Sequence, residues 1–480
     1  MSITAPTQAR VASLDQFRGY TVVGMFFVNF VGSFLAIPAI FHHHHTYCSY
    51  ADTIMPQFFF AVGFAYRLTL LRRLSTGSAL AAYVRVFRRS LGLVLVALVV
   101  YHLSGRYETW QSLRELDLPT FLGLWKRQPF QTLLHIAVTQ IWVLPVIAAR
   151  PSVRIIFAIA SGLLHLYLSY LFNYEWSWAI HRYDGTPRGV DGGPLAFLTW
   201  TIPMLAGSLA YDAVMPDPRA ARCGKIFFWG FVVMLLAYAI SCLSLVEALV
   251  IPRLSLPPSS WSPPTPSSGG PDEFIPEPGA EPAAEEKSTL AALWDRAEEH
   301  LVEPPFVPPT RQVNIWSMSQ RAGSLAYLTF GAGFSLFLYA FFVMVCDLDS
   351  RRARLFGNVA MSAMAAFLML EMVVNLVLEL AELAGRPFVA ANSPLWSPVV
   401  WLVLFLVLFA LDPWRSAFFR TFGVNALVGY ILHDMVGDLI KPFSPKDSPL
   451  WYVSLAFLVF LAINYLFLRS LEKNKIFVRL

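Results

Sequence analysis

The chain has little charge for its length. Only 14% of its 480 residues are Asp, Glu, Lys or Arg, whereas 56% are hydrophobic. Soluble domains carry about 25% charged residues, and a chain of this length needs far more polar surface than this one offers. The scarcity of charge excludes an ordinary soluble protein. The net charge of +5 is expected from basic loops on one side of a membrane and does not indicate nucleic-acid binding.

Cysteine is also scarce, with four residues whose spacing matches neither a zinc site nor a redox pair. We therefore expect no metal. A cleavable signal peptide is not evident either, because the segment from Met1 to Gln16 is polar and the following apolar run has no small-residue cleavage site. That first run is expected to remain as a membrane span.

Apolar runs of about 20 residues recur along the chain, and each is long enough to cross a bilayer as a helix. They predict an all-α, polytopic integral membrane protein with twelve transmembrane helices. The expected spans lie near 19–41, 53–71, 85–104, 130–149, 153–174, 194–214, 225–251, 323–347, 357–380, 395–412, 421–440 and 450–469.

The basic residues predict the orientation of these spans. With the N-terminus inside, 22 of the 36 Lys and Arg residues fall on inner segments, as the positive-inside rule requires. Both termini are then cytoplasmic, in the cytoplasmic (inner) membrane of a bacterial type of cell.

The predicted organisation has three parts: an N-terminal transmembrane bundle (1–251), a Pro-rich extracytoplasmic loop (252–318) and a C-terminal transmembrane bundle (319–480). Within the loop, apolar residues from Leu290 to Leu301 recur at helical spacing after Ser288, a candidate N-cap. A short amphipathic helix is expected there, as a tether or as a lid.

The most informative motif is His42-His43-His44-His45, which is followed by Asp52 at the start of the second span. A neutral imidazole takes a proton near neutral pH, and a nearby carboxylate orients it. The run is therefore a candidate catalytic base. The alternatives are metal binding and simple anchoring of the histidines among lipid headgroups.

Polar residues inside two later spans are further candidates, because such residues are costly unless they face a cavity or a partner. Asn425, Gly429 and His433 share one face of the predicted 421–440 helix, with Asp434 beside them. They suit either ligand contact or close helix packing. Glu371 and Glu379, with Asn375 between them, share a face of the 357–380 helix. They favour a secondary transporter, or simple hydrogen bonding between helices.

A third group lies at the predicted inner surface. Asp15 and Arg18, just before the first span, pair with each other in the simplest interpretation. Together with Arg88 and Arg89, Arg18 could instead form a patch that binds phosphates.

Several of these blocks, in this order, resemble the heparan-α-glucosaminide N-acetyltransferase family. No single block is specific, but the ordered set is. The blocks are Ser13-Leu14-Asp15-Gln16-Phe17-Arg18-Gly19 with Phe27-Val28-Asn29, the histidine loop ending at Ala51-Asp52, Pro56 with Gly63, Arg89-Ser90, Asp191-Gly192, Leu205-Ala206-Gly207, Asn314 to Ser319, Gly423-x-Asn425 with His433 and Asp434, and Lys473 to Phe477. The sequence differs from the family at Leu134-His135, where a Gln-Arg pair is usual, and in two additional spans, near 357–380 and 395–412.

The resemblance implies that cytosolic acetyl-CoA donates its acetyl group to a sugar amine on the far side of the membrane, with a histidine of the first outer loop as the catalytic residue. Alignment on Thr46-Tyr47 favours His45 or His44, whereas an ungapped count from Asp52 favours His42. The route is either direct or through an acetyl-histidine.

The expected partners are acyl-CoA, the bilayer and an extracytoplasmic amino sugar or glycan hydroxyl, and a homodimer stays open. We assign donor binding to Arg18, Arg88, Arg89, Asp15 and Asn29, and stabilisation of the oxyanion to Asn425 or His433. The alternative functions are a secondary transporter with Glu371 and Glu379 as its coupling site, and a scaffold without catalysis.

Overall fold

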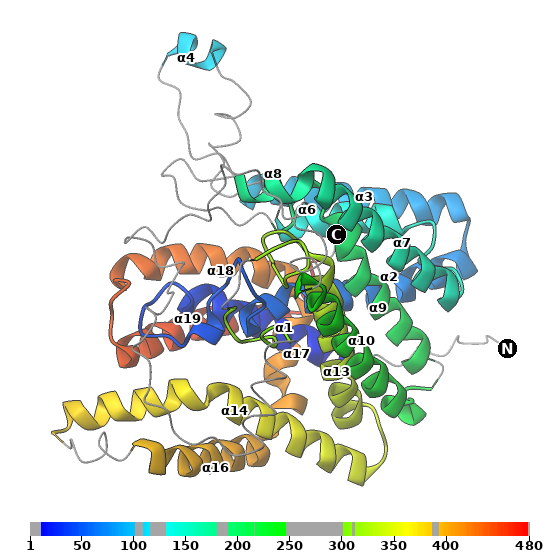
Figure 1. Cartoon of the computed structure of the whole chain (residues 1–480). Helices are drawn as coiled ribbons and strands as arrows, with labels where there is room; N and C mark the ends of the chain where they lie inside the picture. The colour runs from blue at the N-terminus through cyan, green and yellow to red at the C-terminus, as the bar shows by residue number, and fades with distance from the viewer. Residues whose placement is uncertain are drawn as a thin grey trace. The chain divides into compact units, whose positions relative to one another are not determined.

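Every regular element in the computed structural model is helical within the residues that it describes, 11–100, 109–115, 131–179, 191–215, 217–245, 301–309, 313–385 and 393–478 (Figure 1). The longer helices are α1 (Ala12–Val31), α2 (Tyr50–Thr76), α3 (Ala79–Val100), α6 (Thr132–Val143), α7 (Pro151–Leu168), α9 (Phe197–Val214), α10 (Cys223–Ser241), α13 (Leu325–Cys346), α14 (Arg351–Leu383), α16 (Ser393–Leu411), α18 (Ala426–Ile440) and α19 (Leu450–Lys473). The shorter elements are η1 (Ala39–Phe41), α4 (Trp110–Arg114), η2 (Ser169–Asn173), α8 (Tyr174–Ala179), η3 (Gly193–Leu195), η4 (Pro218–Ala220), η5 (Pro413–Arg415), α17 (Ala417–Val424) and η6 (Lys441–Phe443). The all-α prediction is confirmed for this part of the chain.

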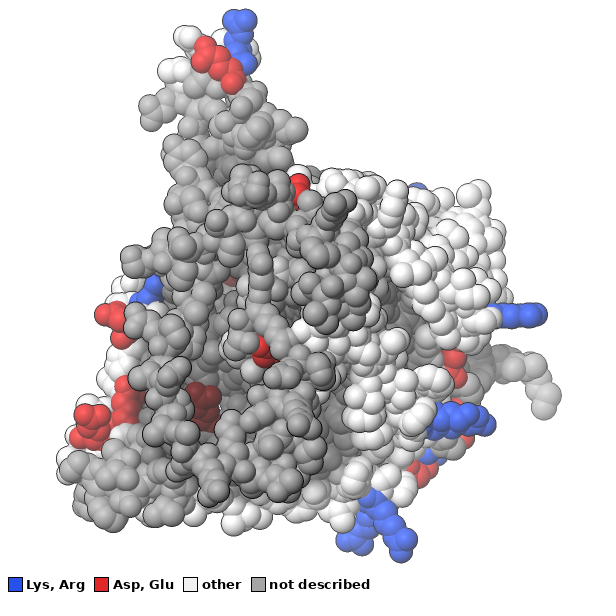
Figure 2. Space-filling view, in the orientation of Figure 1, with Lys and Arg blue, Asp and Glu red and all other residues white. Residues whose placement is uncertain are grey.

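Among the described residues, eight helical stretches are long and apolar enough to cross a bilayer. Their outward surfaces carry apolar side chains where a soluble protein would place charges. On α7, for example, Ile156, Ile159 and Leu163 are each more than half exposed. The surface around α7 contains almost no charged side chains in Figure 2. Such a surface fits a helix bundle surrounded by lipid.

Described helices overlap all twelve predicted ranges, but only eight helical stretches have the length and hydropathy of a membrane span. Three differences from the predicted bounds matter for the site. The first helix begins at Ala12, so Asp15 and Arg18 lie inside the helix and not before it; an acidic residue is favourable in a first turn. The predicted 130–149 helix ends at Val143. The predicted 421–440 helix is divided at Asn425 between α17 and α18.

The early end of α6 is stabilised by a side chain of α2. At 12 residues, α6 rises only about 18 Å, less than the roughly 30 Å of a bilayer core. Its chain then turns, and the buried Arg67 guanidinium donates to the carbonyl oxygens of Ile147 at 2.6 Å and Ala149 at 3.3 Å. Arg67 thereby satisfies carbonyls that no longer have helical partners.

The described chain separates into two compact units, each assembled from separate stretches of sequence. Unit 1 comprises Met1–Pro38, Ala210–Trp229 and Leu336–Arg479, and unit 2 comprises Ala39–Leu209 and Gly230–Ser335. The sequence analysis divided the chain into consecutive parts, so its boundaries do not coincide with these units. The amphipathic helix predicted between Leu290 and Leu301 falls almost wholly outside the described residues.

In each unit, glycines allow two helices to cross closely. In unit 2, a Cβ atom at Gly63 of α2 would overlap the backbone of Met204, and one at Gly207 of α9 would overlap Phe60. In unit 1, a Cβ atom at Gly423 of α17 would overlap the Asp15 carbonyl of α1. Small residues of this kind let backbones approach in membrane bundles. Several glycines in the ordered blocks of the sequence therefore have a packing role.

Candidate functional site

The histidine run lies in a loop that is anchored at the first turn of α2. Ser49 caps this helix: Asp52 donates its backbone N–H to the Ser49 hydroxyl at 3.4 Å, and the Asp52 carboxylate accepts from the Ser49 N–H at 2.9 Å. This reciprocal pair is a capping box, which satisfies two N–H groups at the start of a helix. The Ser49 hydroxyl also donates to the His42 carbonyl oxygen at 2.7 Å. The cap therefore ties the loop to the helix.

The same carboxylate orients one imidazole of the run. Asp52 Oδ1 lies 2.9 Å from His43 Nδ1; the Asp52 side chain is fully buried, while 39% of the His43 side chain is exposed. When Nδ1 donates to the carboxylate, the acceptor nitrogen of the neutral ring is Nε2. A base needs this arrangement: a fixed tautomer, and charge stabilisation behind the ring.

His43 is the member of the run that our ranking by sequence passed over in favour of His45, His44 and His42. Because the four histidines are consecutive, their spacing cannot indicate which ring faces Asp52. The signal that was available is the Ser49–Asp52 capping pattern, which predicts a carboxylate turned back toward the loop.

His44 has a different environment from His43. Its Nε2 lies 2.8 Å from the Ala39 carbonyl oxygen, and its ring stacks on Tyr47 with the centroids 4.3 Å apart. Burial lowers the pKa of His44 below the ordinary value of 6.5, because a desolvated ring disfavours the charged form. Burial likewise raises the pKa of Tyr47 to about 12. His44 and Tyr47 thus form a neutral, stacked wall of the loop.

Residues from α13 and the segment before it hold the loop from another side. The Ser319 hydroxyl donates to the His45 carbonyl oxygen at 2.6 Å, and Tyr327 donates to the Asp52 carbonyl oxygen at 2.7 Å. The Ser319 contact gives the Asn314 to Ser319 block a structural role. These contacts fix the backbone around the His43–Asp52 pair.

A second feature of unit 2 is a small basic cavity near the C-terminal end of α2. It encloses about 230 Å³ and is lined by Tyr66, Thr69, Leu70, Arg73, Val86, Arg89 and Gln140. Both polar atoms of the fully buried Gln140 amide have no hydrogen-bond partner within the structure. Two guanidinium groups beside an unsatisfied amide suit a phosphate-bearing ligand. Of the predicted donor-binding residues, Arg89 lines this cavity, whereas Arg88 is exposed on α3.

The other predicted residues belong to unit 1. There His433 connects α18 to α1, because its Nε2 lies 3.2 Å from the Asn29 amide nitrogen and its ring stacks on Phe26 at 5.3 Å. The Tyr430 carbonyl oxygen accepts from His433 Nδ1, which leaves Nε2 as the acceptor for Asn29. Asp434 lies 3.6 Å from that nitrogen. In this tautomer the proton of His433 is held by the Tyr430 carbonyl oxygen.

Asn425 does not share a helix face with His433, because it is the residue at which α17 ends and α18 begins. Its amide donates to the Ile476 carbonyl oxygen at 3.1 Å, and its Oδ1 accepts from the Val478 N–H at 3.3 Å. Asn425 therefore anchors the C-terminal tail. Arg18 and Asp15 are half-buried on α1, in a different unit from Arg89.

The carboxylates that favoured a transporter also lie in unit 1, on α14. Glu379 accepts from the backbone N–H groups of Leu450 at 3.1 Å and Trp451 at 2.9 Å, and so caps the N-terminus of α19. Glu371 is exposed. At 1.5 Å per residue, Glu371 lies about 25 Å and Glu379 about 37 Å along the helix from Arg354. That spacing places them toward the far edge of a bilayer about 30 Å thick rather than at its centre.

No protein-family model matches the chain, and no curated protein matches it. Within the described ranges, no group of three or more His, Cys, Asp or Glu side chains has the arrangement of a metal site.

Proposed function

We propose that the protein is a membrane acyltransferase that moves an acetyl group from cytosolic acetyl-CoA to an amino sugar or glycan hydroxyl on the extracytoplasmic side. The observation that carries this proposal is the His43–Asp52 pair, a carboxylate-oriented imidazole at the N-terminal end of an apolar helix. The topology predicted from the basic residues places that end outside. The resemblance to the N-acetyltransferase family, which includes a histidine in the same loop, supports it.

In this proposal His43 acts as the base. Its Nε2 takes a proton from the acceptor nitrogen or oxygen while that atom attacks the thioester carbonyl carbon. The carbon–sulfur bond then breaks, and the leaving thiolate takes a proton to give free CoA thiol. Asp52 stabilises the imidazolium that forms between these steps. The acetyl-histidine route uses the same nitrogen as the nucleophile.

The basic cavity at the other end of α2 is the proposed docking place for the phosphates of the donor. Asp52 and Arg73 are 21 residues apart on one helix, or about 31 Å. The pantetheine arm has about thirteen bonds between phosphate and sulfur and spans about 15 Å, at a chain reach of about 3.5 Å per three bonds. The arm alone therefore covers about half the distance. For the thioester to reach His43, the phosphates must therefore leave the cavity and move past Arg73 into the bundle.

The cavity would therefore bind the donor before the reaction and not during it. A kinetic experiment tests this role. Purified protein is incubated with acetyl-CoA and glucosamine, and release of free thiol is followed. Arg89→Gln should raise the KM for acetyl-CoA at least tenfold and leave kcat nearly unchanged, since a capture site contributes no contact specific to the transition state. Arg85→Gln, on the same helix but exposed, is the matched control and should behave as wild type. Absence of thiol release from the wild-type protein with any amine or hydroxyl acceptor would overturn the proposed function.

A further inference from the structure

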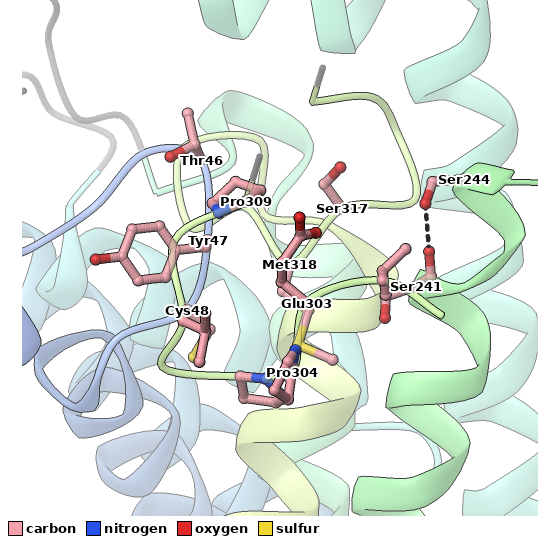
Figure 3. A pocket seen from close by; sticks show the side chains of 13 residues that line it. Thr46, Tyr47, Cys48, Ser241, Ser244, Glu303, Pro304, Pro309, Ser317 and Met318 are labelled. Atoms are coloured by element: carbon pink, nitrogen blue, oxygen red, sulfur yellow. Dashed lines mark hydrogen bonds between the residues drawn. The ribbon is translucent and has the colours of Figure 1, made fainter. Parts of the chain in front are cut away.

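A hollow in unit 2 adjoins the histidine loop; with its open mouth included, its empty volume is about 480 Å³. Thr46, Tyr47 and Cys48 of the loop lie on one side of it, and Ser241 and Ser244 at the end of α10 lie on the other, with Glu303 between them (Figure 3). We call this hollow the loop pocket.

The roof of the loop pocket is the segment 301–309, which is attached to the loop and to α10. The Phe306 N–H donates to the Cys48 carbonyl oxygen at 2.9 Å, and Tyr238 donates to the Val302 carbonyl oxygen at 2.6 Å. Phe306 has a φ of 75°, a conformation that side-chain-bearing residues rarely adopt, and its ring packs against Phe330 at 5.8 Å. These anchors hold the Glu303 side chain against the pocket.

The loop pocket is lined by Thr46, Tyr47 and Cys48, which directly follow the histidine run. Tyr47 lines it and stacks on the His44 ring at 4.3 Å, and His44 follows His43 directly. A molecule in the pocket therefore lies beside the segment that carries the His43–Asp52 pair. The pocket and this pair belong to the same unit.

The chemistry of the lining matches a sugar ring. Hydroxyl groups come from Ser241, Ser244, Ser317 and Thr46, a carboxylate comes from Glu303, and proline rings supply apolar faces. The Ser241 and Ser244 hydroxyls donate to the carbonyl oxygens of Tyr238 and Ser241 at 2.7 Å, so toward a ligand their oxygens accept, and a carboxylate likewise accepts from sugar O–H groups or from an ammonium group.

We infer that the loop pocket is the acceptor site and that it binds a single hexosamine unit, with Glu303 as the residue that selects a hydroxylated, cationic acceptor. This inference rests on the proposed function for the reaction that follows binding. Glu303 is a specificity residue in this account, and the proton is still taken by His43.

The first test measures binding of the sugar in the absence of acetyl-CoA, so that the result does not depend on catalysis. Isothermal titration of the detergent-purified protein with glucosamine should give saturable binding, and Glu303→Gln should weaken it at least tenfold, as expected for loss of a hydrogen bond to a charged group. Glu175→Gln, an exposed glutamate of α8 that does not line the pocket, should bind as wild type. Ser241→Ala together with Ser244→Ala should weaken binding without touching the histidine loop.

Steady-state kinetics separate this inference from the proposed function. Glu303→Gln should raise the KM for glucosamine at least tenfold and leave the KM for acetyl-CoA unchanged. If the wild-type protein transfers acetyl groups but Glu303→Gln alters neither sugar binding nor the KM for glucosamine, the acceptor site lies elsewhere and the acyltransferase proposal stands. If glucosamine binds as expected but acetyl-CoA neither binds nor reacts, the pocket is a sugar site and the acyltransferase proposal fails.

Discussion

Replacing Asp52 by asparagine keeps the size of this buried side chain and removes one of its two acceptor oxygens. In the wild-type protein Oδ1 faces His43 Nδ1 at 2.9 Å, while Oδ2 accepts from the Ser49 N–H at 2.9 Å and lies 3.4 Å from the His44 N–H. If the amide oxygen keeps the Ser49 N–H, the NH₂ group faces His43 Nδ1, which must then accept, and the ring proton moves to Nε2; if the amide is turned the other way, its NH₂ group faces the Ser49 N–H. Either the helix cap or the tautomer of His43 that leaves Nε2 as a base is then lost.

The expected cost follows from these contacts. In the arrangement that loses the cap, the lost cap costs about 1 kcal/mol, and the unsatisfied buried donor adds about 1–3 kcal/mol. The sum is about 2–4 kcal/mol. Because the entropy of unfolding is about 2.1 cal/mol/K per residue, or about 1 kcal/mol/K for this chain, the melting temperature should fall by about 2–4 °C. The rate of acetyl transfer should fall about 10²–10⁴-fold, the usual contribution of an oriented base.

The assay measures melting in detergent and thiol release on the same preparation. Asp217→Asn is the matched control, because Asp217 also caps a helix start but is exposed, and it should change neither quantity appreciably. If Asp52→Asn melts as wild type and retains full transfer, the carboxylate neither caps α2 nor orients a base, and the assignment of His43 is wrong.

Three further predictions follow from packing, capping and titration. Gly63→Ala should destabilise the protein by about 1–3 kcal/mol, because the added Cβ meets the Met204 backbone. Gly224→Ala, with open space around it, is the control and should be neutral or slightly stabilising. Equal melting temperatures of the two variants would refute the close crossing of α2 and α9. Glu379→Gln should lower stability by about 1 kcal/mol, because it weakens the cap on α19. Glu371 is exposed, and Glu371→Gln should not change stability. Loss of uptake of a solute by the Glu371→Gln variant would instead support a transporter. Because the pKa of His44 is lowered in the folded state, the unfolded chain binds more protons just below pH 6.5, so stability should fall as the pH is lowered from 7 toward 5. His44→Gln should flatten that dependence in a series of melting curves, and an unchanged slope would count against the buried ring.

The helical class and the positions of most helices could be predicted because they depend on apolar runs, which are local. The errors came from contacts that are distant in sequence. The break at Asn425 is stabilised by the backbone of the tail near Ile476 and Val478, and the early end of α6 is stabilised by Arg67 of another helix. Neither partner can be inferred from spacing along the chain. The start of α1 at Ala12 cannot be read from apolar runs, because the first turn of this helix is polar.

The candidate site was predicted in outline and not in detail. The sequence indicated a histidine loop with Asp52, and the structure places one of those rings, His43, on that carboxylate. It could not indicate which ring, since adjacent residues in a loop have no periodicity that fixes their directions. The loop pocket was not foreseen either, because Glu303 and Ser241 are brought beside Tyr47 only by the folded chain. Arg73 and Gln140 likewise join Arg89 through the packing of three helices.

Transfer across the membrane by His43, oriented by Asp52, can be measured in vesicles containing the oriented protein, with radiolabelled acetyl-CoA on the cytoplasmic side and glucosamine on the other. The account predicts labelled N-acetylglucosamine on the glucosamine side for the wild-type protein, and a loss of at least 10²-fold for His43→Gln with unchanged binding of acetyl-CoA. Labelling by His43→Gln at the wild-type rate would contradict it, as would product that forms only on the side of the donor.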